Sequence, residues 1–173
     1  MSKLKTPVNS NDHFQGNESA TLILVEYGDY QCPHCGRAYP IIKRVQKKLG
    51  DKLKFVFRNF PLAESHPDAT NAAVSSEVAG AHGKFWEMHD MLFENQEALD
   101  GDSLISYAAK IGIKAAQFES EFEKPEFLKK VEADFESGVR SGVNGTPSFF
   151  VNGEKYNGDW DEEPLLAFLA EHV

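Results

Sequence analysis

The distribution of apolar residues predicts two strands near the start of the chain, with a helix between them. An apolar run at residues 22–27 and an alternating segment at residues 53–57 are both typical of strands. Between them, apolar residues recur at helical spacing from Ala38 to Leu49. Because a helix separates the two strands, we expect them to pair in parallel through a right-handed crossover.

The rest of the chain shows helical patterns first and then returns to strands. Gly101 and Gly112 break the helical part, which covers residues 68–80, 84–95, 103–111, 114–122 and 125–139. Residues 148–151 and 154–156 are then expected to form a hairpin, because the Asn152-Gly153 pair between them is a strong turn signal. A last helix is predicted from Glu162 to Glu171.

These elements predict an α/β fold, in which helices flank a mixed four-stranded sheet and an all-helical insertion follows the second core strand. We assign residues 1–20 to an irregular N-terminal arm, because polar and turn-forming residues dominate it. Residues 21–65 and 126–173 are expected to form the sheet domain, and residues 66–125 the helical insertion. The aromatic residues of the insertion are expected to lie in its core rather than in a cofactor pocket.

Composition narrows the classes of function. Among 173 residues, 18 basic and 27 acidic side chains give a net charge of −9, which argues against nucleic-acid and anionic-membrane partners. No apolar run approaches the roughly 20 residues of a membrane span. The first residues carry charge without the apolar stretch of a signal peptide. We therefore expect a cytoplasmic monomer, although a chain trimmed of its signal peptide would be periplasmic.

Cys32 and Cys35 are the only cysteines, and they lie where the first strand passes into the first turn of a helix. Free N–H groups and the macrodipole at a helix start stabilise a thiolate, and such cysteines have pKa values of roughly 3.5–7.5 instead of about 8.5. Pro33 suits the first helical position, and His34 adds a group that can be cationic near neutral pH. We therefore predict that Cys32 is the nucleophile and that the more buried Cys35 resolves a mixed disulfide.

Two other readings of the cysteine pair are weaker. A zinc site would need two further ligands, but there is no second cysteine pair and the other histidines are scattered singly. An inert structural disulfide would close so small a loop that it would stabilise the fold little. Redox chemistry is therefore favoured, and we predict neither a metal nor a cofactor.

Taken together, these features resemble the DsbA-type members of the thioredoxin superfamily, over nearly all of the chain from about Asp12. The resemblance rests on Cys32-Pro33-His34-Cys35, on Glu26 six residues earlier, and on Gly145-Thr146-Pro147 before the hairpin. Residues 12–16 and 58–62 are similar to a subgroup that occurs alone or fused to bacterial sodium/proton antiporters. The resemblance implies a thioredoxin fold with a helical domain inserted into it.

The resemblance also implies roles for single residues. Pro147 is expected to follow a cis peptide bond and to face the cysteine pair, so that the backbone of Thr146 can pair with a substrate strand. Glu26 matches a buried acid that accepts the proton of Cys35, and burial would raise its pKa. The competing interpretation of Glu26 is a carboxylate that faces solvent at the end of a strand.

The function we expect is thiol–disulfide exchange with protein or peptide substrates. Tyr30 and Gln31 precede the nucleophile and are predicted to contact substrates, whereas His13 is more consistent with a packed or exposed residue than with the rim of the site. Without a third cysteine there is no internal relay, so an external redox partner is required. A stabilised thiolate favours an oxidase, but a reducing cytosol favours a reductase, and the direction stays open.

Three alternative functions remain. A disulfide isomerase would use the same pair, but the dimerisation module typical of isomerases has no counterpart in this chain. Glutathione-linked relatives share the helical insertion but generally lack the resolving cysteine, so Cys35 argues against them. A non-catalytic redox or binding module that regulates a partner, such as a transporter, belongs to a different class of function.

Overall fold

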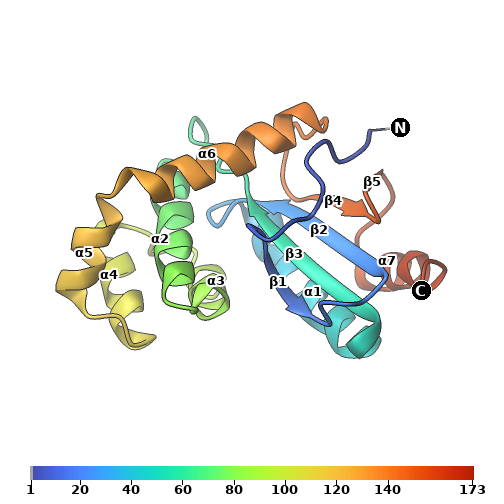
Figure 1. The fold of residues 1–173 in the computed structure, drawn as a ribbon, viewed down its shortest axis with the longest axis horizontal. Helices are drawn as coiled ribbons and strands as arrows, with labels where there is room; N and C mark the ends of the chain where they lie inside the picture. The colour runs from blue at the N-terminus through green and yellow to red at the C-terminus, as the bar shows by residue number, and fades with distance from the viewer. Residues whose placement is uncertain (1) are drawn as a thin grey trace.

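The computed structural model describes residues 2–173 and is built around one twisted sheet (Figure 1). Within those residues the sheet has five strands in the order β1-β3-β2-β4-β5. β2 and β3 pair in parallel, and the other neighbours pair antiparallel. The bounds of the strands are β1 His13–Gly16, β2 Leu22–Gly28, β3 Leu53–Asn59, β4 Ser148–Val151 and β5 Glu154–Tyr156.

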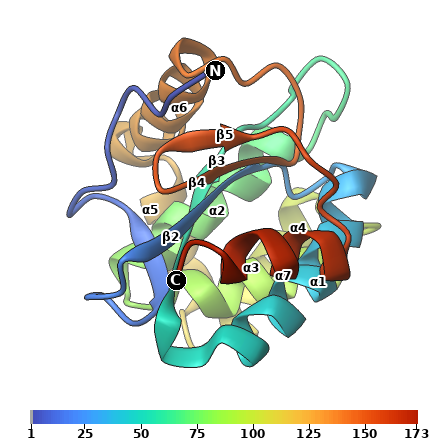
Figure 2. The ribbon, with the colours of Figure 1, turned by 90° about the vertical axis from the view of Figure 1, so that its right-hand side faces the viewer.

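Helices cover both faces of the sheet. Figure 2 shows α7 beside α1 on one side of the sheet and α6 on the other side. A short 3₁₀ turn, Gly50–Lys52, joins α1 to β3. The helix bounds are α1 Pro33–Leu49, α2 Ala69–Ala81, α3 Phe85–Phe93, α4 Gly101–Lys110, α5 Ala115–Phe122, α6 Pro125–Arg140 and α7 Glu162–Ala170.

The expected connections between the central strands are confirmed. β2, α1 and β3 form the parallel crossover, with Val25 opposite Val56 in the register. The turn between β4 and β5 has positive φ angles at both Asn152 (49°) and Gly153 (87°). Two such residues match the backbone twist of a tight hairpin, and this explains why asparagine followed by glycine occupies the turn.

The fold class is confirmed, but the sheet has one strand more than the four that we predicted. The supposedly irregular arm contains β1, which pairs antiparallel with β3 from His13 opposite Phe57 to Gly16 opposite Lys54. β1 is only four residues long and most of it is half-buried, so it has no clear apolar alternation. β1 forms because the edge of β3 is free to pair with it. The sequence of the arm alone therefore does not predict this strand.

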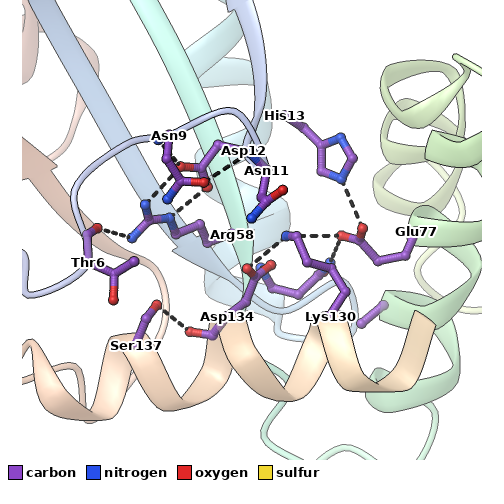
Figure 3. A network of polar contacts seen from close by, with 12 residues as sticks. Thr6, Asn9, Asn11, Asp12, His13, Arg58, Glu77, Lys130, Asp134 and Ser137 are labelled. Carbon is purple, nitrogen blue, oxygen red and sulfur yellow. Dashed lines mark hydrogen bonds and ion pairs between the residues drawn. The ribbon is translucent and has the colours of Figure 1, made fainter. Parts of the chain in front are cut away.

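A buried ion pair fixes the arm to the sheet (Figure 3). Arg58 on β3 donates from Nε and Nη2 to the two carboxylate oxygens of Asp12, both at 2.8 Å, and from Nη1 to the carbonyl of Thr6 at 2.9 Å. Arg58 Nη1 also donates to the hydroxyl of Tyr27, which in turn contacts Ser137 on α6. The arm, two central strands and α6 are therefore joined through one guanidinium group.

The segment between β3 and β4 is helical, as expected, and is formed by α2–α6 (Figure 1). Its buried side chains, such as Val78, Met88 and Leu104, belong to the same hydrophobic core as Leu24 and Phe55 of the sheet. The insertion therefore packs continuously on the sheet domain, and the domain boundaries that we expected stay a prediction. Among residues 2–173, no helix combines the length and hydropathy that a membrane crossing requires.

Candidate active site

The two cysteines lie at the N-terminus of α1, at the end of the turn that follows β2. Cys32 keeps an extended backbone and caps the helix, with Pro33 in the first turn and the Gly36 N–H bonded to the Cys32 carbonyl at 3.0 Å. Both sulfur atoms belong to free thiols, and Cys32 is 3% exposed while Cys35 is fully buried. Cys35 is thus the inner residue of the pair, as its position in the helix predicts.

The pKa of the Cys32 thiol is lowered to about 5. The largest cause is a hydrogen bond from the Cys35 thiol; burial acts in the opposite direction. Further lowering comes from Thr146 and from the backbone N–H groups of Cys35 and His34 at the helix start. The lowered pKa agrees with the sequence-based expectation, but the strongest cause is the neighbouring thiol rather than the histidine side chain, which is exposed.

Thr146 and Pro147 face the outer cysteine, as expected. The Thr146–Pro147 bond is cis, and the Thr146 carbonyl lies 3.7 Å from the Cys32 sulfur. The Thr146 hydroxyl oxygen is buried without a hydrogen-bond partner among the described residues. It is therefore free to donate to Cys32 once that sulfur is a thiolate, whereas the thiol form donates to the Thr146 carbonyl.

Glu26 is buried on β2 beneath the cysteine pair, with 3% of its surface exposed. Burial raises the pKa of its carboxyl to about 8, and the charge on Cys32 acts in the same direction. One carboxyl oxygen, Oε2, has no hydrogen-bond partner among the described residues. The interpretation of Glu26 as a solvent-facing carboxylate is therefore wrong, because burial and the raised pKa are those of an enclosed acid.

Cys35 has the opposite acid–base behaviour to Cys32. Burial raises its pKa well above the usual value, and both the hydrogen bond to Cys32 and the charge of Glu26 add to the rise. The backbone N–H of Asp29, 3.5 Å from the Cys35 sulfur, acts the other way. At neutral pH the site therefore combines an outer thiolate with an inner thiol.

The remaining predicted site residues are divided between the surface and the core. Pro33 and His34 are exposed beside Cys32. Gln31 is half-buried, and its side-chain oxygen accepts the backbone N–H of Asp68 at 2.8 Å. Tyr30 is 1% exposed and donates to or accepts from His89 Nδ1 at 2.9 Å, so its side chain is enclosed by protein and does not offer the substrate contact that we expected.

His13 belongs to another part of the molecule. Its ring stacks on Phe85 at 3.8 Å between centroids, and its Nε2 lies 3.0 Å from the carboxylate of Glu77. Among the described contacts, none joins His13 to the cysteine pair. The expectation that it is a packed residue rather than a part of the site rim agrees with these contacts.

Gln96, which the sequence analysis did not identify, contacts the turn that carries the cysteines. Its amide nitrogen donates to the backbone carbonyls of Tyr30 and Cys32, both at 2.9 Å. A Cβ atom on Gly36 would lie 2.1 Å from the Gln96 side-chain oxygen, so a larger residue at that position would displace the Gln96 amide from the turn. No local pattern in the sequence marks this contact, because Gln96 lies 64 residues after Cys32.

The chain is similar to proteins of a known family. A family model described as Thioredoxin matches residues 8–171. The chain is 42% identical to "Na(+)/H(+) antiporter NhaA 1" from Mycobacterium sp. (strain KMS) over 160 aligned residues. The alignment covers 91% of this chain and 26% of that protein. It is 38% identical to "Na(+)/H(+) antiporter NhaA" from Herminiimonas arsenicoxydans, over 96% of this chain and 26% of that protein. The chain thus spans about a quarter of the length of the curated relatives it matches.

Solved structures show the same similarity. Oxidised BdbD from Bacillus subtilis is 25% identical, with a TM-score of 0.86 over 99% of this chain and 97% of that chain. The thiol-disulfide exchange protein alpha-DsbA2 from Wolbachia pipientis is 21% identical, with a TM-score of 0.84 over 95% of this chain and 89% of that chain. In the second case the similarity is one of fold.

Proposed function

The chain belongs to the thioredoxin family, with a DsbA-like fold, and from this premise we propose that it exchanges disulfides with protein or peptide thiols. Cys32 is the nucleophile and Cys35 the resolving thiol. The observation that carries the proposal is the contrast between the two sulfurs: the pKa of Cys32 is lowered to about 5, while that of Cys35 is raised.

In the direction of reduction, the Cys32 thiolate attacks a substrate disulfide, and one substrate thiolate leaves. Cys35 then loses its proton and attacks the Cys32 sulfur of the mixed disulfide. The second substrate thiolate leaves, and Cys32 and Cys35 become the disulfide. Two electrons pass from the dithiol to the substrate, and oxidation of a substrate dithiol follows the same steps in reverse.

Glu26 is proposed as the acceptor of the proton that Cys35 loses. Its carboxyl is buried beneath the pair, and its pKa of about 8 lies close enough to neutral pH for the group to gain and lose a proton during turnover. A small cavity against Glu26 is lined by surface side chains of α1, among them Lys43 and Gln46.

The low pKa of Cys32 bears on the direction of the reaction. A stabilised thiolate favours the reduced form, which makes the disulfide a stronger oxidant. The chain contains no third cysteine to reset the pair, so an external thiol or another redox partner has to do so. The prevailing direction then depends on the redox poise of the compartment in which the protein works.

Catalytic reduction of insulin disulfides tests the proposal. The wild-type protein, supplied with a small thiol as reductant, should accelerate insulin precipitation, and Cys32→Ser should reduce the rate to that of the reductant alone. An exposed-residue control such as Glu64→Gln should retain wild-type activity, because Glu64 lies on a surface loop. Equal activity of Cys32→Ser and wild type would refute the role of Cys32.

A second candidate function comes from the names of the relatives. Proteins called Na⁺/H⁺ antiporters align with this chain over about a quarter of their own length, which favours a module that works together with a transporter. Such a module would bind its partner without turnover. Insulin reduction separates the two candidates, because a binding module would leave the rate of precipitation at that of the reductant alone.

A further inference from the structure

The carboxylate of Asp29 is buried beneath the turn that carries the two cysteines, and the mechanism described above does not use it. Its side chain is fully enclosed, with 0% exposure. Oδ1 accepts the backbone N–H of Gln31 at 2.8 Å, and Oδ2 accepts the backbone N–H of Leu62 at 3.0 Å. The ring nitrogen Nδ1 of His66 lies 2.7 Å from the same Oδ2. Three donors therefore converge on one buried carboxylate.

The backbone of the same residue contacts both cysteines. The Asp29 N–H points at the Cys35 sulfur at 3.5 Å, and the Asp29 carbonyl accepts the Cys32 N–H at 3.1 Å. Any rotation of the Asp29 backbone would change both contacts. The side chain, held by three hydrogen bonds, opposes such a rotation.

We propose that Asp29 is a positioning residue of the dithiol and that His66 holds it in place. Negative charge develops on the Cys35 sulfur when this thiol loses its proton and attacks the mixed disulfide. The Asp29 N–H is the donor that faces that sulfur, so the contact is stronger in the resolving step than in the resting thiol. The inference rests on the proposed function, because it concerns the second step of disulfide exchange.

His66 gives the buried Asp29 carboxylate a hydrogen-bond partner from a second loop. Its side chain comes from the loop between β3 and α2 and is 20% exposed, so the imidazole reaches both Asp29 and solvent. Burial of a carboxylate is costly unless its oxygens accept hydrogen bonds, and the His66 ring nitrogen, 2.7 Å from Oδ2, adds a third partner to the two backbone N–H groups. The bond between Gln31 and the Asp68 N–H joins the same two loops a second time.

The hydrogen-bond pattern explains why an aspartate is required. All three of its partners donate, and a carboxylate can accept from every one of them. An asparagine has the same shape but only one oxygen, so its NH₂ group would face a donor. Asp29→Asn therefore breaks the hydrogen bonds of the side chain without a change in its volume. The variant thus distinguishes an effect of these hydrogen bonds from an effect of packing.

The experiment uses the reduced protein and 5,5′-dithiobis(2-nitrobenzoate) in stopped flow at neutral pH. Attack by the Cys32 thiolate releases one coloured thiolate and leaves a mixed disulfide. Attack by Cys35 on the Cys32 sulfur releases the second coloured thiolate and closes the Cys32–Cys35 disulfide. The first phase depends on reagent concentration, whereas the second is intramolecular and does not. Cys35→Ser should show the first phase alone, which assigns the two phases.

The proposal predicts an effect on the second phase. Displacement of the backbone N–H of residue 29 from the charged sulfur is expected to slow this phase by about tenfold or more in Asp29→Asn, with a change of less than about twofold in the first phase. His66→Ala should slow the second phase in the same direction. Glu64→Gln removes an equal charge from an exposed carboxylate on the same loop and should leave both phases unchanged.

Two results would count against the proposal in distinguishable ways. Wild-type rate constants for the second phase in both Asp29→Asn and His66→Ala would overturn it and leave the proposed function intact. A wild-type protein that released no coloured thiolate would instead refute the proposed function, and this inference with it. Far-UV circular dichroism reports separately whether each variant folds, and if Asp29→Asn does not fold, the partly exposed His66 still decides the question.

Discussion

The two sulfur atoms of the dithiol lie one helical turn apart and yet differ in acid–base behaviour, and the cause is local. Cys32 receives hydrogen bonds from the Cys35 thiol, from Thr146 and from the start of α1, while Cys35 is fully buried above Glu26. Each thiol influences the other, since the proton that Cys35 keeps is the one that stabilises the Cys32 thiolate. This mutual dependence can be tested at single residues.

The rate at which iodoacetamide alkylates Cys32 should rise with a midpoint near pH 5 in the wild-type protein. In Cys35→Ala the midpoint should move upwards, towards the ordinary cysteine pKa of about 8.5, because the largest cause of the lowering is gone. His34→Ala serves as the matched control and should move the midpoint less, since the His34 side chain is exposed. A wild-type midpoint near 8.5 would contradict the assignment of Cys32 as the nucleophile.

Glu26 gives the free energy of unfolding a defined pH dependence. The pKa of its carboxyl is raised from 4.5 to about 8 in the folded protein, so the folded state binds more protons than the unfolded state between these values. Its stabilising contribution is complete below pH 4.5 and is lost as pH rises through 8. Glu26→Gln should therefore change stability little in acid and raise it, on the order of a few kcal/mol, above pH 8.

Urea unfolding of wild type and Glu26→Gln across this pH range measures the effect. The difference between the two proteins should grow steadily from acid to alkaline pH. A difference that did not vary with pH would mean that Glu26 ionises as freely in the folded protein as in the unfolded chain.

At the level of elements, the arm and β1 show how a buried ion pair holds an edge strand. Asp12 and Arg58 are both nearly inaccessible, and Arg58 also binds the carbonyls of Thr6 and Pro7. Burial alone would raise the pKa of Asp12, but the hydrogen bonds and charge of Arg58 outweigh it, and the pKa is lowered. The pair therefore stabilises the fold at neutral pH and ceases to do so when Asp12 is protonated in strong acid.

Asp12→Ala should lower the free energy of unfolding by about 3 kcal/mol or more at neutral pH, because it leaves the guanidinium of Arg58 buried without its counter-charge. Asp51→Ala, which removes an exposed carboxylate, is the control and should change stability by less than about 0.5 kcal/mol. Chemical unfolding at pH 7 measures both values. Equal stabilities of the two variants would show that the arm is not held by this pair.

At the scale of the whole molecule, apolar periodicity was sufficient to predict the central strands, the crossover and the inserted helices, and the Asn152-Gly153 pair to predict the hairpin. These features depend on local spacing, and so does the position of Cys32 at a helix start. The additional strand β1 depends on the free edge of β3, and the burial of Tyr30 depends on helices brought together by folding. Gln96 reaches the cysteine turn, and His66 reaches Asp29 in that turn, through contacts between segments that are distant in the sequence, which no local pattern predicts.

The reduction potential of the Cys32–Cys35 pair tests the central claim, that the pair is poised for exchange, most directly. It is measured by equilibration with glutathione redox buffers of known composition. Since the pKa of Cys32 is about 5, the potential should lie between that of thioredoxin, about −270 mV, and that of DsbA, about −120 mV. A potential below about −300 mV, typical of structural disulfides, would contradict the account.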